Sequence, residues 1–356
     1  MSKVLIKGNE AIARAAVAAG CDAFFGYPIT PQNEIPEYLS KLLVEHGKAF
    51  VQAESEVAAI NMVYGAAGTG ARVMTSSSSV GIALKQEGIS YMAGAQLPCV
   101  IVSIMRGGPG LGGIQPSQAD YFQATRGGGN GDYHVIVFAP ESIQETVDLM
   151  KEAFDIADQY RNPVMILADG LIGQMMESVD MDRPAKKREI KPKTYATTGT
   201  DYHEGRNIIT SVFLDPIQLE NHNLELQAKY RQVEKNEVRF ELTNMENAEY
   251  VIVAYGTSAR ICRSAIETLH DQGINVGMIR PISLWPFPKK AFEHIPSSCK
   301  GILVTEMSMG QMIDDVKIVN KGKLPIAFYG RTGGVVPEPE EIVEAILHFN
   351  EKVVES

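Results

Sequence analysis

Cysteine is scarce in this chain of 356 residues, and the four that occur lie far apart. Cys21, Cys99, Cys262 and Cys299 form no CxxC pair, so neither a zinc site nor an iron–sulfur cluster has a local set of ligands. The seven histidines show no HxH or HxxxH pairing, and we expect this chain to bind no metal by itself. Scattered single thiols are typical of a reducing compartment, which favours a cytoplasmic protein.

Long apolar runs and an excess of basic charge are also absent. No apolar stretch approaches the roughly 18 residues of a membrane span. The 33 Lys and Arg residues are outnumbered by 43 Asp and Glu residues, which gives a net charge of −10 and disfavours a nucleic-acid surface. The small residues before Cys21 are similar to a lipoprotein cleavage box, but Glu10 and Arg14 interrupt the apolar stretch that a signal peptide needs. We therefore expect neither a membrane nor a nucleic-acid partner.

Three common catalytic motifs are missing as well, namely GxxxxGK[ST], HExxH and GxSxG. One GxGxxG match, Gly108–Gly113, follows an apolar strand pattern. A dinucleotide site needs a helix to begin there, and the sequence continues with Ile-Gln-Pro instead. A nicotinamide-dependent dehydrogenase built on this loop remains a distant alternative, and a flexible lid over a site is the preferred interpretation.

Strand and helix patterns alternate through most of the chain. They run from residue 8 to residue 168 and again from residue 248 to residue 349. This alternation predicts an α/β protein with two doubly wound parallel-sheet units. We predict a first domain over residues 1–180, a linker with a bridging helix over 181–247, and a second domain over 248–356. The basic, proline-containing run at 182–193 is interpreted as a solvated connection, and a polar helix is expected over 220–242.

Four groups at expected strand ends carry functional side chains. Arg106 ends the buried strand pattern before the glycine loop, where α/β folds place ligands. It can grip a carboxylate through two hydrogen bonds, although an ion pair with a neighbouring acid is equally open. Glu54-Ser55-Glu56 opens a helix and is either a cap or a carboxylate facing a ligand, and Thr30 between Ile29 and Pro31 is either a helix-start residue or a rigid contact. Residues 75–79 suit either an anion site or a helix cap.

Taken together, these segments resemble the pyrimidine-binding (alpha) subunit of the 2-oxoacid:ferredoxin oxidoreductases. The resemblance covers nearly the whole chain and includes the segments GYPITP at 26–31, QAESE at 52–56, MRGGPG at 105–110, GNGD at 129–132 and VAYGT at 253–257. The combination is similar to the branch acting on 3-methyl-2-oxobutanoate (2-ketoisovalerate). Relatives acting on 2-oxoglutarate tend to carry Ser-Thr after the Gly-Pro of the arginine loop, where this chain has Gly110-Leu111. The same reaction on 2-oxoglutarate is the main alternative.

The resemblance implies a role for each site residue. Glu56, which Ala58-Ala59 follow at the matching offset, falls on the catalytic glutamate beside the aminopyrimidine of thiamine diphosphate. A carboxylate there favours the imino tautomer that takes the proton from the thiazolium C2. Tyr27, Pro28, Ile29 and Thr30 would contact the cofactor, Thr30 and Arg106 the substrate. The fold implied is a pyrimidine-type domain followed by a transketolase C-terminal-like domain without a catalytic residue.

The resemblance also implies partners. Thiamine enzymes bind diphosphate and magnesium through a GDG motif with a later Asn, and Ala168-Asp169-Gly170 lacks its first glycine. The diphosphate and Mg²⁺ would be bound by a beta subunit, and the [4Fe–4S] clusters by gamma or ferredoxin-like subunits. The expected activity is oxidative decarboxylation of a branched 2-oxo acid to acyl-CoA, with coenzyme A as acyl acceptor and ferredoxin as electron acceptor. A non-catalytic scaffold whose partner performs all the chemistry is the third hypothesis.

Overall fold

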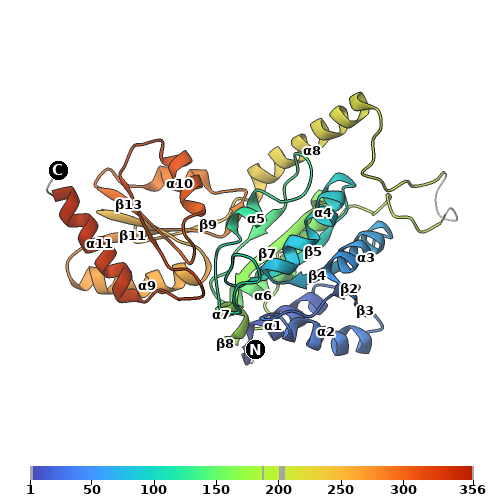
Figure 1. Ribbon diagram of the computed structural model, residues 1–356, viewed down its shortest axis with the longest axis horizontal. Helices are drawn as coiled ribbons and strands as arrows, with labels where there is room; N and C mark the ends of the chain where they lie inside the picture. The colour runs from blue at the N-terminus through green and yellow to red at the C-terminus, as the bar shows by residue number, and fades with distance from the viewer. Residues whose placement is uncertain (1–2, 187, 200–204, 355–356) are drawn as a thin grey trace.

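Two α/β lobes lie side by side in the computed structural model, which describes residues 3–186, 188–199 and 205–354 (Figure 1). The N-terminal lobe is built on a seven-stranded sheet in the order β12-β6-β7-β5-β4-β2-β3. Six of its strands are parallel and the edge strand β12 is antiparallel. The strands are β2 (Ala23–Gly26), β3 (Ala49–Gln52), β4 (Val73–Ser77), β5 (Cys99–Met105), β6 (Ile136–Phe138), β7 (Pro163–Asp169) and β12 (Ser283–Trp285).

Helices cover both faces of this sheet. One group packs through α1 against α2 and α6, and the other pairs α3 with α4. The chain passes from one face to the other when the strand order reverses after β3, as right-handed crossovers require. The helices are α1 (Gly8–Ala18), α2 (Glu34–Glu45), α3 (Glu56–Gly68), α4 (Ser79–Gly94), α5 (Tyr121–Thr125), α6 (Ile143–Tyr160) and α7 (Gly170–Gln174). A separate antiparallel pair joins β1 (Val4–Lys7) to β8 (Met176–Val179).

The central strands are apolar because both of their faces are covered. Every residue of β5 and of β7 is buried. Continuous apolar runs of this kind are typical of parallel sheets between two helical layers, so the expected fold class is confirmed. The functional side chains follow the carboxyl ends of these strands.

The connection between the lobes differs from its expected form. The polar helix α8 is Pro216–Asn236, so it ends before the predicted residue 242, and Phe240 belongs to strand β9 (Phe240–Thr243). The basic run before it is not simply solvated: Arg188 pairs with the buried Glu237 at 2.6 Å, and Lys193 pairs with the buried Asp158 at 2.7 Å. Residue 187 of this run lies outside the described residues. The linker is therefore anchored to the first lobe.

The C-terminal lobe is a second, smaller α/β unit. Its sheet has the order β14-β13-β10-β11-β9, with β9 antiparallel at one edge. Helices α9 and α11 pack together on one side of it and α10 lies on the other (Figure 1). The further elements are β10 (Tyr250–Val253), α9 (Gly256–Asp271), β11 (Val276–Pro281), the 3₁₀ helix η1 (Lys289–His294), β13 (Gly301–Glu306), α10 (Met312–Asn320), β14 (Ile326–Gly330) and α11 (Pro339–Val354).

A strand of the later chain completes the sheet of the first lobe. β12 follows β11 directly in sequence, yet it leaves the second sheet and pairs with β6. Its Trp285 stacks on His134, just before β6, with ring centroids 4.3 Å apart. The predicted domain boundaries at residues 180 and 247 stay a prediction. β12 belongs to the predicted second domain in sequence, but it lies in the sheet of the first lobe.

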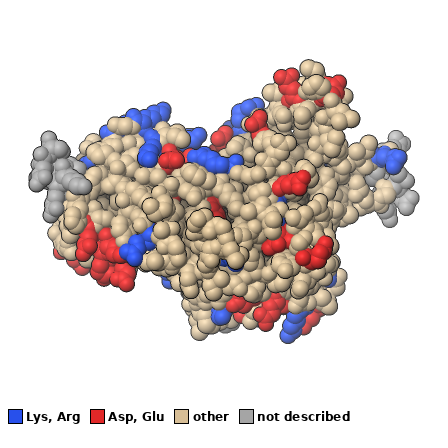
Figure 2. Space-filling view, in the orientation of Figure 1, with Lys and Arg blue, Asp and Glu red and all other residues tan. Residues whose placement is uncertain are grey.

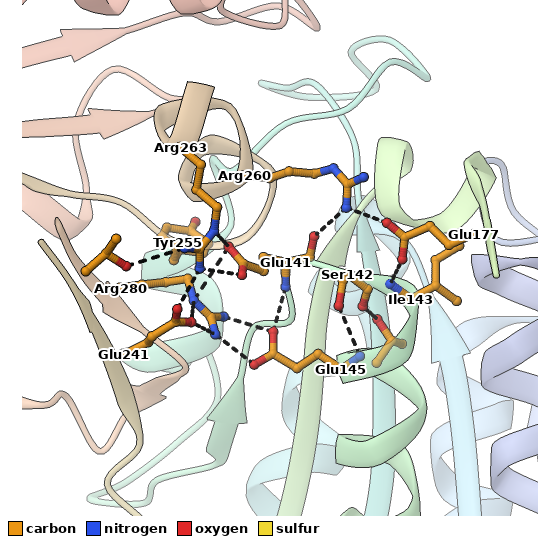
Figure 3. A network of polar contacts seen from close by, with 12 residues as sticks. Glu141, Ser142, Ile143, Glu145, Glu177, Glu241, Tyr255, Arg260, Arg263 and Arg280 are labelled. Carbon is orange, nitrogen blue, oxygen red and sulfur yellow. Dashed lines mark hydrogen bonds and ion pairs between the residues drawn. The ribbon is translucent and has the colours of Figure 1, made fainter. Parts of the chain in front are cut away.

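Ion pairs between arginines and glutamates fasten the lobes together (Figure 3). Arg280 at the end of β11 is nearly buried and bonds Glu145 of α6 at 2.9 Å and Glu241 of β9 at 2.7 Å. Arg263 of α9 bonds Glu141, which precedes α6, at 2.6 Å. Buried charges of this kind are tolerated only when they are paired, so the network fixes one relative position of the two lobes.

Candidate active site

The loop after β2 is fixed from within the protein. Gln32, fully buried, accepts a hydrogen bond from Ser76 Oγ of β4 at 2.5 Å. Asn9 of α1 donates to the carbonyl oxygen of Pro31 at 2.8 Å. Thr30 directly precedes these anchors, and its hydroxyl accepts a hydrogen bond from Asn33 at 3.2 Å. The loop therefore presents Thr30 on a rigid backbone at the carboxyl edge of the sheet.

Glu56 begins α3 at the same edge. Ser55 caps the helix by accepting a hydrogen bond from the Ala58 amide at 3.1 Å, which turns the next side chain inward. Glu56 is only 6% exposed, and its carboxylate has no hydrogen-bond partner among the described residues. Glu54, by contrast, is exposed. A buried carboxylate without a donor is costly unless a ligand supplies one.

A glycine of α4 makes room for this carboxylate. A Cβ atom at Gly81 would lie 2.6 Å from Glu56 Oε1 and 2.0 Å from Ser77 Oγ, so only glycine permits this approach. The hydroxyls of Ser77 and of Ser78 are buried and have no partner among the described residues. The structure thus brings a carboxylate and two unpaired hydroxyls together at one strand end. Buried polar groups without a partner are available to a bound ligand.

Arg106 follows β5, which lies two strands from β2 in the sheet, and it is 7% exposed. Its Nη1 donates to the Thr30 carbonyl oxygen at 3.0 Å and its Nη2 to the Leu111 carbonyl oxygen at 3.3 Å, while its Nε has no partner among the described residues. The structure therefore brings Arg106 and Thr30 into direct contact, and their expected contacts with the substrate stay a prediction. A guanidinium that is hydrogen-bonded only to carbonyl oxygens has no acidic partner, so its positive charge is available to bind an anion.

Asp120 lies behind Arg106 and is linked to it through Ser79. The Ser79 hydroxyl contacts Asp120 Oδ2 at 2.5 Å and accepts a hydrogen bond from the Arg106 amide at 3.0 Å. Burial raises the pKa of Asp120 to about 6, although the Ser79 hydrogen bond and the Arg106 charge oppose the shift. Asp120 thus carries a proton at a higher pH than an ordinary aspartate.

A cavity of about 570 Å³ opens beside these groups, between the two lobes. The first lobe contributes Ser79, Gly108–Gly110 and Asp120, and the second contributes Met309, Gln311 and Thr332. Gln118 fixes the wall between them, because its side chain bonds the Tyr255 carbonyl oxygen at 2.8 Å and the Met307 amide at 3.0 Å. The C-terminal lobe therefore shapes the cavity at this site.

The other predicted cofactor contacts lie at the rim of the site. Tyr27 is 37% exposed and Pro28 is exposed, while Ile29 is half-buried. Sequence reasoning treated residues 75–79 as a helix cap or an anion site and did not single out Ser77, Ser78 or Asp120. An acid-free run of hydroxyls after an apolar strand was the available signal for the two serines.

The glycine loop does not begin a helix. After Arg106 the chain remains irregular until α5 at Tyr121, and α5 has five residues. The dinucleotide alternative therefore lacks the helix N-terminus that would face a pyrophosphate. Asp169 caps α7 instead, by accepting a hydrogen bond from the Leu171 amide at 2.9 Å. Within residues 3–186, 188–199 and 205–354, no group of His, Cys, Asp or Glu is arranged to hold a metal ion, and no helix is long and apolar enough to cross a membrane.

Comparison with known proteins agrees with this geometry. Residues 14–245 match the family model described as pyruvate flavodoxin/ferredoxin oxidoreductase, thiamine diphosphate-binding, and residues 248–342 match pyruvate:ferredoxin oxidoreductase core domain II. The fold and the site thus define a thiamine diphosphate-binding domain joined to a core domain II. The chain belongs to the 2-oxoacid:ferredoxin oxidoreductase family, in which it is a subunit.

Its relatives in the family differ in their stated substrates. The chain is 48% identical to the ketoisovalerate oxidoreductase subunit VorB of Methanothermobacter thermautotrophicus, over 97% of both chains. It is 35% identical to the 2-oxoglutarate synthase subunit KorA of Methanocaldococcus jannaschii, over 98% of this chain and 100% of that relative. Both similarities extend through the two lobes.

Solved structures show the same architecture. The 2-oxoglutarate:ferredoxin oxidoreductase from Magnetococcus marinus, with 2-oxoglutarate, coenzyme A and succinyl-CoA bound, superposes with a TM-score of 0.87 at 26% identity. The match covers 98% of this chain, which spans 65% of the length of that solved chain. A split-gene transketolase superposes with a TM-score of 0.61 at 15% identity over 96% of this chain and 97% of the other, which supports the fold alone.

Proposed function

We propose that this chain is the pyrimidine-binding subunit of a complex that oxidatively decarboxylates 3-methyl-2-oxobutanoate to an acyl-CoA and carbon dioxide, and passes the electrons to ferredoxin. The observation that carries the proposal is Glu56, a buried carboxylate without a donor that faces the Gly81 gap in α4. When bound, thiamine diphosphate supplies the carbon nucleophile and the electron sink for this reaction. The groups around the gap fit its aminopyrimidine.

Each protein group then has a defined task. Glu56, which is only 6% exposed, accepts a hydrogen bond from the protonated pyrimidine ring nitrogen. Arg106 grips the carboxylate of the 2-oxo acid with the donors that now contact only carbonyl oxygens and with its free Nε. Thr30 orients the substrate or the cofactor from the rigid loop. The Tyr27–Ile29 segment borders the ring.

The complex completes the site with groups of other subunits. We place the diphosphate and Mg²⁺ on a beta subunit, and the [4Fe–4S] clusters on gamma or ferredoxin-like subunits. An apolar face beside Glu56 supports such a partner: Tyr27, Val57, Leu84 and Tyr91 are large, at least 37% exposed, and lie on the loop, α3 and α4. The middle of the face shown in Figure 2, over α4, carries few charged side chains. Exposed apolar surface of this kind marks protein–protein contacts.

The substrate branch rests on the relatives. Identity is 48–49% to two ketoisovalerate oxidoreductase VorB subunits and 32–37% to the 2-oxoglutarate synthase subunits over similar lengths, while a ketoisovalerate oxidoreductase VorA subunit is 28% identical. The side chain of 3-methyl-2-oxobutanoate is uncharged, and the cavity presents no lysine or arginine for a second carboxylate. A branched 2-oxo acid is thus the favoured substrate.

The test uses the complex purified anaerobically with its partner subunits. We expect coenzyme A- and thiamine diphosphate-dependent viologen reduction to be faster with 3-methyl-2-oxobutanoate than with 2-oxoglutarate. Glu56→Gln should abolish turnover in an assembled complex, whereas Glu54→Gln, two residues away and exposed, should leave it unchanged. Full activity in Glu56→Gln would refute the catalytic role. Faster turnover of 2-oxoglutarate would refute the substrate branch alone.

A further inference from the structure

A lysine is completely buried beneath the proposed pyrimidine site. Lys85 of α4 has no exposed surface, and it is the only lysine or arginine in that helix. Its ammonium donates to Thr75 Oγ1 at 2.6 Å and to the Ser76 carbonyl oxygen at 3.1 Å, both at the end of β4. Among the described residues no carboxylate lies within 4.0 Å of it. A charged group in this position costs folding free energy that a methionine would not.

Helix geometry directs Lys85 toward Glu56. Gly81, Lys85 and Gly88 are spaced by four and three residues, so they lie along one stripe of α4. The first of them faces the Glu56 carboxylate and the last faces Ile60, one turn further along α3. Lys85 therefore lies on the contact between α3 and α4, next to the level of the carboxylate.

The charges around Lys85 are few. Glu56 of α3 is the acid that acts on it most strongly, and the Cys99 thiol of β5 acts more weakly. From β4 it meets only the neutral Thr75 and Ser76. Burial lowers the pKa of Lys85 to about 7, and the charge of Glu56 opposes that shift. Lys85 and Glu56 thus form a buried pair of opposite charges whose members do not touch.

We propose that Lys85 is a positioning residue for the reaction, whose buried positive charge lies behind the Glu56 carboxylate and favours the proton of their hydrogen bond on the pyrimidine ring nitrogen. The inference rests on the proposed function, because it concerns the ring that Glu56 would contact. A cation behind the carboxylate stabilises its ionised form. The ring nitrogen then retains the proton, which is the arrangement required for the iminopyrimidine form.

The experiment replaces the charge in the assembled complex. Lys85→Met keeps an unbranched side chain, one atom shorter, and removes its charge. Lys229→Met is the matched control, because Lys229 of α8 is a second poorly solvated lysine, whose pKa burial also lowers to about 7, and no acid acts on it. The readouts are the near-ultraviolet circular dichroism band of the iminopyrimidine, followed against pH, the values of kcat and KM, and the melting temperature without thiamine diphosphate.

We expect the iminopyrimidine band of Lys85→Met to appear only at higher pH than in the wild type. We expect kcat to fall at least tenfold, KM to stay within twofold, and the melting temperature not to fall. Lys229→Met should keep both the band and kcat within twofold of wild type, and Lys85→Arg should retain the band. If Lys85→Met does not fold, Lys85→Gln gives the same comparison, because it also removes the charge and keeps a hydrogen-bond donor on the side chain.

Two results would overturn the proposal: an unchanged band and kcat in Lys85→Met, or equal changes in Lys229→Met. The Glu56→Gln background separates this proposal from the proposed function. Because turnover is already abolished in that background, the readout there is the iminopyrimidine band: Lys85→Met should not change it further, and a further shift of the band would show that Lys85 acts without Glu56. Wild-type turnover in Glu56→Gln alone would instead refute the catalytic site itself.

Discussion

The contact between Gly81 and Glu56 gives the sharpest prediction. In Gly81→Ala the new methyl group would lie 2.6 Å from Glu56 Oε1 and 2.0 Å from Ser77 Oγ, so the carboxylate must shift. A shift of roughly 1 Å is enough to break a hydrogen bond to a ring nitrogen. Because a positioned acid–base group contributes about 100-fold or more to rate, we expect kcat to fall about 100-fold.

The effect on folding should be small by comparison. Overpacking costs about 1–3 kcal/mol, and replacing a helical glycine by alanine returns about 1 kcal/mol, so the net loss is about 0–2 kcal/mol. Gly88→Ala is the matched control, because its methyl group would meet Ile60 Cγ2 at 2.5 Å in the same helix contact. Viologen reduction and thermal unfolding are measured for both variants. Equal activity losses, or an active Gly81→Ala, would show that the carboxylate does not act where the structure places it.

Three further changes test other parts of the site and fold. Arg106→Ala should raise KM for the 2-oxo acid, with a loss in kcat/KM of about 100-fold because a charge-assisted grip is worth about 3 kcal/mol; an unchanged KM would remove Arg106 from the substrate contacts. Arg280→Met leaves Glu145 without an ion-pair partner among the described residues, whereas Glu241 keeps its ion pair with Arg263, so the loss in urea unfolding should lie at the low end of about 3–5 kcal/mol; an unchanged free energy of unfolding would show that the network does not stabilise the fold. Burial raises the pKa of Asp120 to about 6. The folded protein therefore becomes less stable, through this group, as the pH rises from about 4 to about 6. Asp120→Asn should therefore melt higher than wild type at pH 7, with a gap that narrows toward pH 5; a constant gap would contradict the titration.

The alternation of strands and helices was predictable because buried parallel strands are uniformly apolar. Two short edge strands were not. β12 is three residues long and lies between prolines, and β9 continues the polar pattern of the helix before it, so neither has a period that distinguishes it. The helix was consequently predicted to end six residues too late. Edge strands depend on pairing with distant residues, which local sequence does not express.

The candidate site likewise contains residues that the sequence predicted and residues that it did not. Glu56, Thr30 and Arg106 were predicted from the resemblance and from their positions at strand ends, and the structure brings Thr30 and Arg106 into contact. Lys85 reads as a surface residue of α4 in the sequence, because only the packing of α3 on α4 buries it. Gly81 likewise has no local signal, since its importance comes from an atom of another helix.

The placement of β12 has a consequence for how this chain can be divided. A cut near residue 247 would remove β12 from the sheet of the first lobe and leave β6 as an open edge. The same cut would separate β9 from β11, since β9 precedes residue 247. Open strand edges invite pairing with other chains, so we expect either half made alone to associate with other chains through its uncovered edge. Each lobe resembles a domain of its own, yet each sheet is completed by a strand from beyond that cut.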